Sequence, residues 1–406
     1  MSGRVIIAGG GAAGLSAAIA AAENGNAVTI LERLPRVGKK LLLTGNGRCN
    51  LGHDGFAFSH YHGSVTQAER ILADFDTRAY FRQFGLYTRT DSEGRIYPMS
   101  GTAASVLDAL RYAAEQLGVQ TLCEKQVTGF SPKNGKWNVF CGAERFSADA
   151  VILAAGGAAA PSCGTDGSLY PVLRKMGYTV VPPVPALCPV PTDPARVRAL
   201  KGLRVRAAVS AVCGNRILKQ ETGEVQFTDT ALSGICIFNL SRLAAESGSR
   251  TEIALDLLPE IPVRETAGIL DFLLFQRGTL PAGDLLTGLL PKRIAETCIK
   301  QSGGNCGAPA SALSAETMQT LTALLRDWRF PVTGTAKFAQ AQVTAGGVAG
   351  ECVTDTLESR LHRGLFFCGE LLDLDGDCGG YNLTWSWASG QTAGASAGSF
   401  LRGGKC

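Results

Sequence analysis

The chain begins with a short hydrophobic run that leads directly into a cluster of glycines. Residues 4–8 are largely β-branched, residues 9–14 contain four glycines, and residues 12–22 are rich in alanine. A second, mostly hydrophobic run over residues 28–31 is followed by Glu32. Apolar runs of this length are typical of strands in a parallel sheet, and the alanine-rich segment favours a helix. The pattern predicts a strand, a tight turn, a helix and a second strand, which together make one βαβ unit.

Gly9, Gly11 and Gly14 have the spacing of a dinucleotide-binding turn. The first glycine permits the turn, the second lets the backbone approach a pyrophosphate, and the third lets the helix pack on the strand. The helix N-terminus then presents its partial positive charge to the phosphates. Glu32 follows the second strand, where a carboxylate accepts hydrogen bonds from both ribose hydroxyls and would repel a 2′-phosphate. We therefore expect a nucleotide with an adenosine diphosphate portion that lacks this phosphate.

A secretory signal peptide is the alternative interpretation of residues 5–22, because Arg4 precedes a long uncharged run. Signal peptides and membrane spans are normally dominated by large apolar side chains. Here glycine and alanine dominate, and a strand is expected directly afterwards. The dinucleotide turn is therefore the favoured interpretation.

Further helices and strands are predicted for the same domain. The hydrophobic spacing predicts helices over residues 67–84, 105–117 and 168–176. Short strands separated by turn residues are expected over 119–155, in the manner of a β-meander, and the last one runs into Gly156 and Gly157. Near the C-terminus, a buried strand is expected to end at Gly369 and Glu370. Residues 379–383 then lead into a helix over 385–400.

The middle of the chain is predicted to be an insert that follows a proline-rich linker. A proline-rich stretch over 182–194 is typical of a linker, so we place a domain boundary near residue 190. Strands are expected over about 195–258, and helices over about 262–330, including 265–275 and 315–328. The expected domains are residues 1–190 together with 335–406, and an insert domain over 191–334.

Composition and charge narrow the classes of partner. The 406 residues are 45% hydrophobic and 18% charged, an ordinary balance for a globular chain of two or three domains. The net charge of +4 is small and no run of five like charges occurs. We therefore expect a small-molecule substrate, no nucleic-acid partner and no membrane partner. The thirteen cysteines lack the close spacing of metal knuckles and redox disulfides. An odd number of cysteines in a long chain for which no signal peptide is expected favours a reducing cytoplasm. The sequence does not indicate an oligomeric state.

Two groups of residues raise the question of a metal. His53, His60 and His62 lie close together in the sequence, but no carboxylate or cysteine ligands are arranged around them. Hydrogen-bonded or exposed loop histidines are the favoured interpretation. Asp373, Asp375 and Asp377 resemble the start of a calcium loop, but the glycine and glutamate that such a loop requires are missing. We expect no metal site.

Residues 38–50 form the second segment of chemical interest. Several glycines among Thr, Asn, Arg and Cys make a poor helix and a poor strand, so a loop with special backbone angles is expected. Loops with many polar groups often carry function, although an ordinary surface turn with solvated lysines fits the composition equally well.

Taken together, the motifs resemble the BaiN/YhiN-type FAD-binding flavoproteins, also called aminoacetone-oxidase-like. The similarity rests on the glycine turn and on residues 40–50, 155–157, 164–167, 343–348, 369–373 and 379–383. It implies an α/β fold in which a two-dinucleotide-binding, Rossmann-like FAD domain with a β-meander is interrupted by a β-plus-helical insert. In this family the insert covers the flavin and shapes the substrate pocket.

The resemblance implies FAD as the cofactor and a set of residues that contact it. No second glycine turn follows a strand, so NAD(P)H is expected only as a diffusible electron donor. The residues expected to bind FAD are Gly9, Gly11, Ala12, Ala13, Gly14, Glu32, Arg33, Lys40, Thr44, Gly47, Arg48, Cys49, Val127, Ala155, Gly156, Gly157, Asp166, Gly369, Glu370, Asp373, Gly380, Tyr381, Asn382 and Leu383.

Arg48, Asn50, Tyr381 and Asn382 are the candidates for catalytic groups near the flavin ring. The helix N-terminus that begins near Tyr381 would stabilise the negative charge of a reduced flavin. Cys49, next to Arg48, is either a low-pKa thiol or a structural cysteine, and the structural role is favoured. Cys378 replaces the threonine that is usual in the family, so no family role is carried over to it.

An FAD-dependent oxidoreductase that transfers a hydride through flavin N5 is the expected activity. The preferred reaction is the NAD(P)H-dependent reduction of an activated C=C bond, as in a 3-oxo steroid or bile-acid enone, because it needs chiefly a clamp for the electrophile. Oxidation of a small amine such as aminoacetone is the alternative that the family also suggests. A flavin-binding redox sensor without turnover is the alternative from another class.

Overall fold

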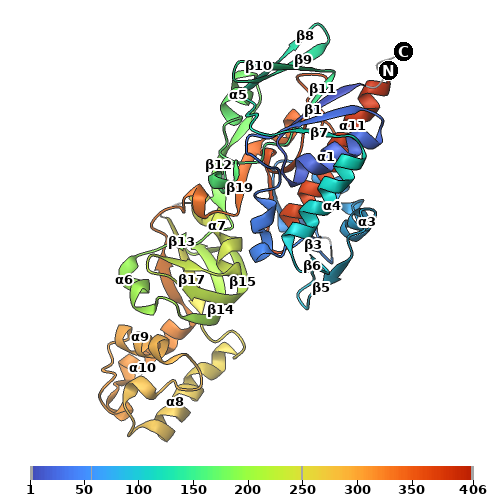
Figure 1. Cartoon of the computed structure of the whole chain (residues 1–406). Coiled ribbons are helices and arrows are strands. Elements are labelled where there is room, and N and C mark those ends of the chain that lie inside the picture. The colour runs from blue at the N-terminus through green and yellow to red at the C-terminus, as the bar shows by residue number, and fades with distance from the viewer. Residues whose placement is uncertain (1–2, 56, 248–249, 404–406) are drawn as a thin grey trace. The chain divides into compact units, whose positions relative to one another are not determined.

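The computed structural model describes residues 3–55, 57–247 and 250–403. The chain forms two compact units, which are coloured by residue number in Figure 1. The main unit consists of Met1–Val184 and Phe338–Cys406, and the insert unit consists of Pro185–Lys337. The outermost residues of the expected first domain, 1–2 and 404–406, lie outside the described residues.

A parallel five-stranded sheet forms the centre of the main unit, with the strand order β20-β11-β1-β2-β7. Ile7 of β1 lies between Ile152 of β11 and Ile30 of β2. All three side chains are fully buried, as expected for a sheet that is covered on both faces. The strands are β1 (Arg4–Ala8), β2 (Ala27–Leu31), β7 (Gln120–Leu122), β11 (Ala150–Leu153) and β20 (Leu365–Phe367). The expected α/β, Rossmann-like architecture is confirmed.

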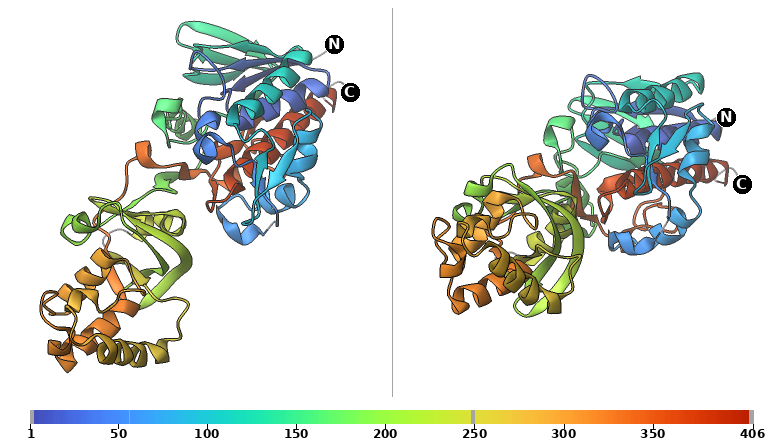
Figure 2. Two further views of the ribbon diagram at one scale, coloured as in Figure 1. Left: turned by 60° about the horizontal axis from the view of Figure 1, so that its bottom comes forward. Right: turned by 90° about the horizontal axis from the view of Figure 1, so that it is seen from below.

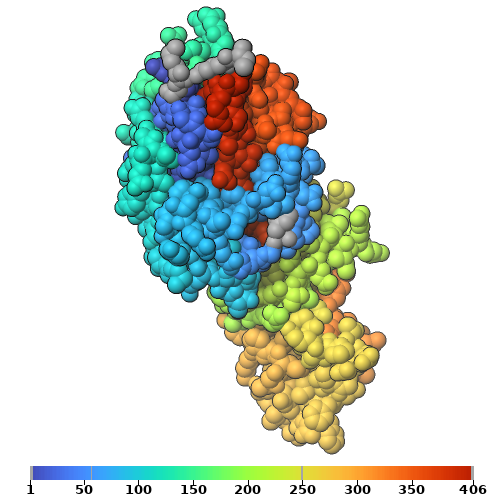
Figure 3. Space-filling view, turned by 90° about the vertical axis from the view of Figure 1, so that its right-hand side faces the viewer, coloured from blue at the N-terminus to red at the C-terminus, as the bar shows by residue number. Residues whose placement is uncertain are grey.

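Helices α1 (Ala12–Glu23) and α11 (Tyr381–Gly403) pack closely through small residues. A Cβ atom at Gly390 would lie 2.4 Å from the carbonyl oxygen of Ala13, and one at Gly394 would lie 2.4 Å from that of Ala17. Glycine at these positions therefore lets the two backbones touch. Figure 3 shows α1 in blue beside α11 in red. The long C-terminal helix thus fixes the position of the glycine turn from the other end of the chain.

Smaller elements surround this sheet. The expected β-meander is present as an antiparallel sheet in the order β10-β9-β8. The helices of this unit that follow α1 are α2 (Ala68–Ala73), α3 (Thr77–Arg82), α4 (Ala103–Gln116) and α5 (Tyr170–Lys175). The remaining strands are β3 (Gly52–His53), β4 (Tyr61–Gly63), β5 (Thr88–Thr90), β6 (Arg95–Pro98), β8 (Gly129–Lys133), β9 (Lys136–Cys141), β10 (Glu144–Ala148), β12 (Val180–Ala186), β19 (Val343–Val348) and β21 (Leu374–Gly376).

The insert unit has its own sheet and its own hydrophobic core. Its six strands have the order β13-β16-β15-β14-β17-β18. In both views of Figure 2 the helices α8, α9 and α10 lie together beside this sheet, in yellow and orange. The strands are β13 (Val190–Pro191), β14 (Arg204–Cys213), β15 (Arg216–Phe227), β16 (Ala231–Ser233), β17 (Thr251–Asp256) and β18 (Trp328–Pro331). The helices are α6 (Pro194–Val197), α7 (Ile235–Ser247), α8 (Thr266–Arg277), α9 (Lys292–Gln301) and α10 (Ala315–Arg326).

Four local predictions were wrong. The helix expected over 67–84 is two short helices, because the Asp76 carboxylate caps a new one by accepting from the amides of Arg78 and Ala79. The linker expected over 182–194 is partly strand, since β12 pairs with β19. Helix α7 interrupts the region where only strands were expected. The helix expected over 315–328 ends at Arg326, and Trp328 is instead the first residue of strand β18. Both differences follow from the insert sheet, because α7 packs its apolar side against the sheet and β18 pairs with β17.

None of the helices in the described part of the chain combines the length and the hydrophobicity needed to cross a membrane.

Candidate functional site

The three glycines of the turn after β1 have different surroundings. Gly9 has a φ of +107°, and its amide donates to the carbonyl oxygen of Leu31 at 2.9 Å. A Cβ atom at Gly14 would lie 1.9 Å from the carbonyl oxygen of Gly9, so only glycine allows the helix to sit against the turn. A Cβ atom at Gly11, in contrast, would have no neighbour within 4 Å. The turn is therefore closed at Gly9 and Gly14 and open at Gly11.

The N-terminus of α1 is free to bind an anion. Gly11 is its N-cap residue and provides no side-chain cap. The first intrahelical bond runs from the Leu15 amide to the carbonyl oxygen of Gly11 at 2.9 Å, which leaves the earlier amides, including those of Ala12 and Ala13, without helical acceptors. Together with the helix dipole, these donors form a cradle of the kind that holds a pyrophosphate.

Glu32 is held rigidly beside this turn. Its Oε2 atom accepts from the Gly10 amide at 2.8 Å, and its Oε1 atom accepts from the Leu34 amide at 2.8 Å. A carboxylate has about four lone-pair positions, so each oxygen retains one for a further donor. The Lys125 amide donates to the carbonyl oxygen of Glu32 at 2.8 Å, which brings the segment leading to Val127 alongside. The Val127 side chain itself is buried in the apolar core.

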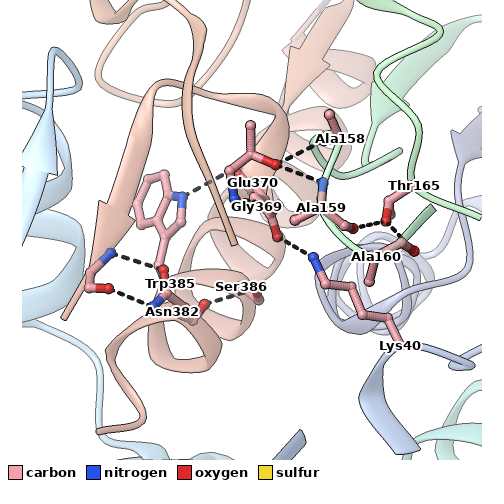
Figure 4. A network of polar contacts seen from close by, with 12 residues as sticks. Lys40, Ala158, Ala159, Ala160, Thr165, Gly369, Glu370, Asn382, Trp385 and Ser386 are labelled. Carbon is pink, nitrogen blue, oxygen red and sulfur yellow. Dashed lines mark hydrogen bonds and ion pairs between the residues drawn. The ribbon is translucent and has the colours of Figure 1, made fainter. Parts of the chain in front are cut away.

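A network of polar contacts joins the turns that follow β11 and β20 (Figure 4). Lys40 Nζ lies 2.7 Å from Glu370 Oε2, and Glu370 Oε1 accepts from the Thr344 amide at 2.9 Å. Thr344 Oγ1 in turn accepts from the amides of Ala158 and Ala159 at 2.8 and 2.9 Å. Lys40 and Glu370 were predicted separately as FAD contacts, and the structure shows that they form one ion pair. The network holds both turns at the carboxyl edge of the sheet, where ligands bind in folds of this type.

The Gly369 turn is fixed from behind by α11. The Gly369 amide donates to Ser389 Oγ at 2.9 Å, and Trp385 Nε1 donates to the Gly369 carbonyl oxygen at 3.1 Å. A Cβ atom at Gly369 would approach the Cβ atom of Ala13 to 2.7 Å. Glycine at this position therefore lets the turn lie directly against the start of α1.

Arg33 and Asp166 form a second ion pair at this edge. Arg33 Nη1 lies 2.7 Å from Asp166 Oδ2. Partial burial acts to raise the pKa of Asp166, but hydrogen bonds from Arg33 and Ser168 outweigh it and hold the pKa below its ordinary value. The pair thus ties the segment after Gly156 and Gly157 to the end of β2.

The loop over residues 38–50 is largely a 3-10 helix, Leu41–Gly47, with an irregular turn at Thr44, Gly45 and Asn46. Cys49 is fully buried with a φ of +58°, and burial raises the pKa of its thiol to about 12. The low-pKa alternative for Cys49 is therefore wrong, because burial disfavours the thiolate. Arg48 is exposed, and its guanidinium lies 5.1 Å from the centroid of the Tyr97 ring.

Asn50 and Gly380 bring this loop to the N-terminus of α11. A Cβ atom at Gly380 would lie 2.5 Å from the Gly52 carbonyl oxygen and 2.7 Å from Asn50 Oδ1. Gly380 has a φ of +105°, so it combines a left-handed backbone with a very close contact. Asn50 Oδ1 is buried and has no hydrogen-bond partner in the described part of the chain. An acceptor in this state is costly unless a ligand or water completes its hydrogen bonding.

Asn382 and Asp373 have structural contacts. The Asn382 side chain accepts from the Gly376 amide at 2.8 Å and donates to the Gly376 carbonyl oxygen at 2.7 Å. This side chain therefore positions β21 beside α11, and its amide group already makes one hydrogen bond through the oxygen and one through the nitrogen. Asp373 Oδ2 accepts from the Ser64 amide at 3.0 Å, whereas its buried Oδ1 has no partner among the described residues.

Tyr381 is packed against two histidines that the sequence analysis did not select. Its ring stacks on those of His53 and His60, with centroid distances of 5.1 and 4.5 Å. Burial, and to a smaller extent the charge of Asp377, raises the pKa of Tyr381. The histidines are hydrogen-bonded, as expected: His60 and His62 both contact Asp377. No signal in the sequence linked them to an aspartate so distant along the chain.

The residues present fit an FAD. The uncapped start of α1 beside open Gly11 suits the pyrophosphate, Glu32 has acceptor capacity for the ribose, and the unpartnered Asn50 Oδ1 beside Gly380 suits a ring with N–H donors. The remaining expected positions, Thr44, Gly47, Ala155 and Leu383, lie in the loop, after β11 and at the start of α11.

Relatives of known name match nearly the whole chain. A 3-dehydro-bile acid delta(4,6)-reductase of Clostridium scindens is 39% identical over 97% of this chain and 98% of its own length. A ribosomal RNA dihydrouridine synthase of Haemophilus influenzae is 27% identical over 95% of this chain and 96% of its own length. Among solved structures, a 3-ketosteroid-delta4-(5alpha)-dehydrogenase from Rhodococcus jostii has a TM-score of 0.49 and 16% identity, covering 98% of this chain and 97% of that one.

The expected oxidoreductase class is confirmed by the long match to a curated reductase. Residues 3–396 match the model of a protein family described as "HI0933-like protein Rossmann domain". The turn after β1, the parallel sheet and the part of α11 up to residue 396 lie within this range. The chain is a member of the HI0933-like Rossmann-domain family.

Proposed function

We propose that the protein is an FAD-dependent reductase that uses NAD(P)H to reduce a C=C bond conjugated to a carbonyl group, with a 3-oxo steroid or bile-acid enone as the substrate class. The single observation that carries this proposal is the 39% identity to a 3-dehydro-bile acid delta(4,6)-reductase over almost the full length of both chains. The ribosomal RNA relatives support the reaction type, because forming dihydrouridine saturates a C=C bond that is also conjugated to a carbonyl.

The residues described above would hold FAD along the carboxyl edge of the parallel sheet. The start of α1 would bind the pyrophosphate, Glu32 would accept from the ribose, and Asn50 with the Gly380 backbone would contact the ring. FAD supplies the hydride at N5 when it is bound and reduced. The N-terminus of α11 would stabilise negative charge at the ring, which favours the reduced form. The exposed guanidinium of Arg48 is the candidate clamp for a substrate carbonyl.

The alternatives differ in what they require. An amine oxidase needs an amine substrate and oxygen as the acceptor, and no relative named above is an oxidase. A redox sensor would show no substrate-dependent rate. Reduction of uridine in RNA is also the reduction of a C=C bond conjugated to a carbonyl, but with a nucleic acid as the substrate. RNA is therefore included in the test as a competing substrate.

Product analysis under anaerobic conditions tests the proposal. The FAD-loaded protein is incubated with NADH or NADPH and, in separate reactions, a 3-oxo-4-ene steroid acid, a uridine-containing ribosomal RNA fragment and aminoacetone. The proposal predicts a steroid product with two added hydrogens and matching NAD(P)H consumption. Saturated uridine with unchanged steroid would move the assignment to RNA. Consumption of aminoacetone with peroxide formation after admission of air would replace it with the oxidase.

A further inference from the structure

Asp377 holds two histidines at the N-terminal end of α11, one with each carboxylate oxygen. Oδ2 lies 3.1 Å from His60 Nδ1, and Oδ1 lies 3.1 Å from His62 Nε2. The Asp377 side chain is 7% exposed, whereas that of His60 is 42% exposed. Antiparallel pairing of β4 with β21 brings them together, and the Asp377 amide donates to the His60 carbonyl oxygen at 2.9 Å. A buried carboxylate thus orients an imidazole that reaches solvent.

The His60 ring is fixed on two sides, through one ring nitrogen and one face. Its Nδ1 atom faces Asp377, and its face stacks on Tyr381 with an interplanar angle of 19°. Its Nε2 atom has no hydrogen-bond partner among the residues that the structure describes. A carboxylate bound to Nδ1 selects the tautomer in which Nδ1 carries the proton and Nε2 is left to exchange protons. This is the arrangement of an acid–base histidine.

His53 and His62 do not share this arrangement. The two ring nitrogens of His53 face the carbonyl oxygens of Asp54 and Glu93 at 3.2 and 2.9 Å. His62 contacts Asp377 through Nε2 rather than Nδ1 and makes no stack with Tyr381. Of these three histidines, His60 combines the Asp377 contact at Nδ1, the Tyr381 stack and an Nε2 atom that has no partner within residues 3–55, 57–247 and 250–403.

We propose that His60 is the proton donor of the reductive reaction, an inference that rests on the proposed function. Hydride addition to the β-carbon of the conjugated bond moves the π electrons toward the α-carbon and the carbonyl oxygen. The His60 imidazolium gives the Nε2 proton to the α-carbon, which completes the second C–H bond. The resulting neutral imidazole keeps the proton on Nδ1, which stays hydrogen-bonded to the Asp377 carboxylate, and Nε2 takes up a new proton from solvent. The hydride and its electron pair come from NAD(P)H by way of the bound flavin.

Separate measurement of the two half-reactions tests this proposal in the FAD-loaded protein. His60→Gln is compared with the matched control His62→Gln, which also loses one histidine contact to Asp377. In His60→Gln, flavin reduction by NAD(P)H should stay close to the wild-type rate, while reoxidation by the 3-oxo-4-ene steroid should slow by about 10²–10⁴-fold. His62→Gln should keep both rates near wild type. Equal slowing of both half-reactions in His60→Gln, or an unchanged reoxidation rate, would overturn the proposal.

Two further readouts separate proton donation from a structural role. Added imidazole should restore part of the reoxidation rate in His60→Ala, because it replaces the lost proton donor, and no restoration counts against the proposal. In FAD-free protein, ¹⁵N NMR of labelled histidine should show His60 in the Nδ1–H tautomer when it is neutral, and Asp377→Asn should remove this preference. An Nε2–H tautomer in the wild type would contradict the arrangement.

Failure of the proposed function gives a different result. In that case no conjugated carbonyl compound reoxidises the reduced flavin even in the wild-type protein. The proposal about His60 is then refuted together with the proposed function. A wild type that turns over the enone while His60→Gln matches it in both half-reactions refutes only the role of His60.

Discussion

Replacing Gly11 with alanine should weaken FAD binding while leaving the fold almost unchanged. The backbone at Gly11, with φ −81° and ψ −167°, is extended and suits alanine. The added Cβ atom would meet nothing within 4 Å, so the apo protein should lose only the difference between glycine and alanine at an N-cap, about 1 kcal/mol or less. With FAD bound, the same methyl group should crowd the pyrophosphate and lengthen its charge-assisted hydrogen bonds. That costs about 2–3 kcal/mol, which is roughly a 30–150-fold increase in Kd.

The assay titrates the apo protein with FAD by fluorescence quenching and measures unfolding in urea by circular dichroism. Gly14→Ala is the contrasting variant, because its Cβ atom would lie 1.9 Å from a backbone oxygen. It should lose on the order of 3 kcal/mol of folding free energy, since the helix must move away from the turn. A Gly11→Ala protein that binds FAD as tightly as the wild type would refute the placement of the pyrophosphate at α1.

Three further results are expected. Because burial raises the pKa of Cys49 to about 12, iodoacetamide at about pH 8 should leave Cys49 unmodified in the native protein while labelling the partly exposed Cys213, as read by peptide mass spectrometry. Asp166→Asn should destabilise the protein at neutral pH. Burial acts to raise the pKa of Asp166, but hydrogen bonds from Arg33 and Ser168 lower it below the ordinary value. The ionised carboxylate therefore stabilises the folded protein fully above the unfolded pKa of about 3.9. This stabilisation is lost as the pH falls through the lower pKa of the folded state. The difference in urea stability between wild type and Asp166→Asn should therefore narrow at about pH 3. Lys40→Met should lower the free energy of unfolding in the same assay by about 1 kcal/mol, because the Glu370 carboxylate then keeps the Thr344 amide as its one partner among the described residues. An unchanged midpoint would show that the ion pair contributes nothing.

The predictable parts of the fold are those in which residues close together in the sequence determine the local structure. The turn at Gly9–Gly14 and the position of Glu32 follow from one βαβ unit, in which spacing along the chain sets spacing in space. The same reasoning failed at residues 67–84, where Asp76 caps a new helix. It also failed at α7, where a segment beginning Ile-Cys-Ile-Phe forms a helix because Leu240 and Ala244 pack on the insert sheet.

The polar network of the site could not be derived from the sequence, because its partners are far apart. Lys40 and Glu370 are separated by 330 positions, and His60 and Asp377 by 317. Family resemblance points to Lys40 and Glu370 one at a time, and nothing in the sequence shows that the two side chains pair. His60 was predicted to be a loop histidine because the carboxylate that orients it lies near the other end of the chain.

Anaerobic stopped-flow spectroscopy of the FAD-loaded protein tests the central claim most directly. The flavin absorbance is followed first on mixing with NADH or NADPH, and then on mixing the reduced protein with a 3-oxo-4-ene steroid acid. The account predicts bleaching by a nicotinamide nucleotide and rapid return of the oxidised spectrum with the enone. Reduction by aminoacetone but by neither nucleotide, with reoxidation by oxygen and not by the enone, would contradict it.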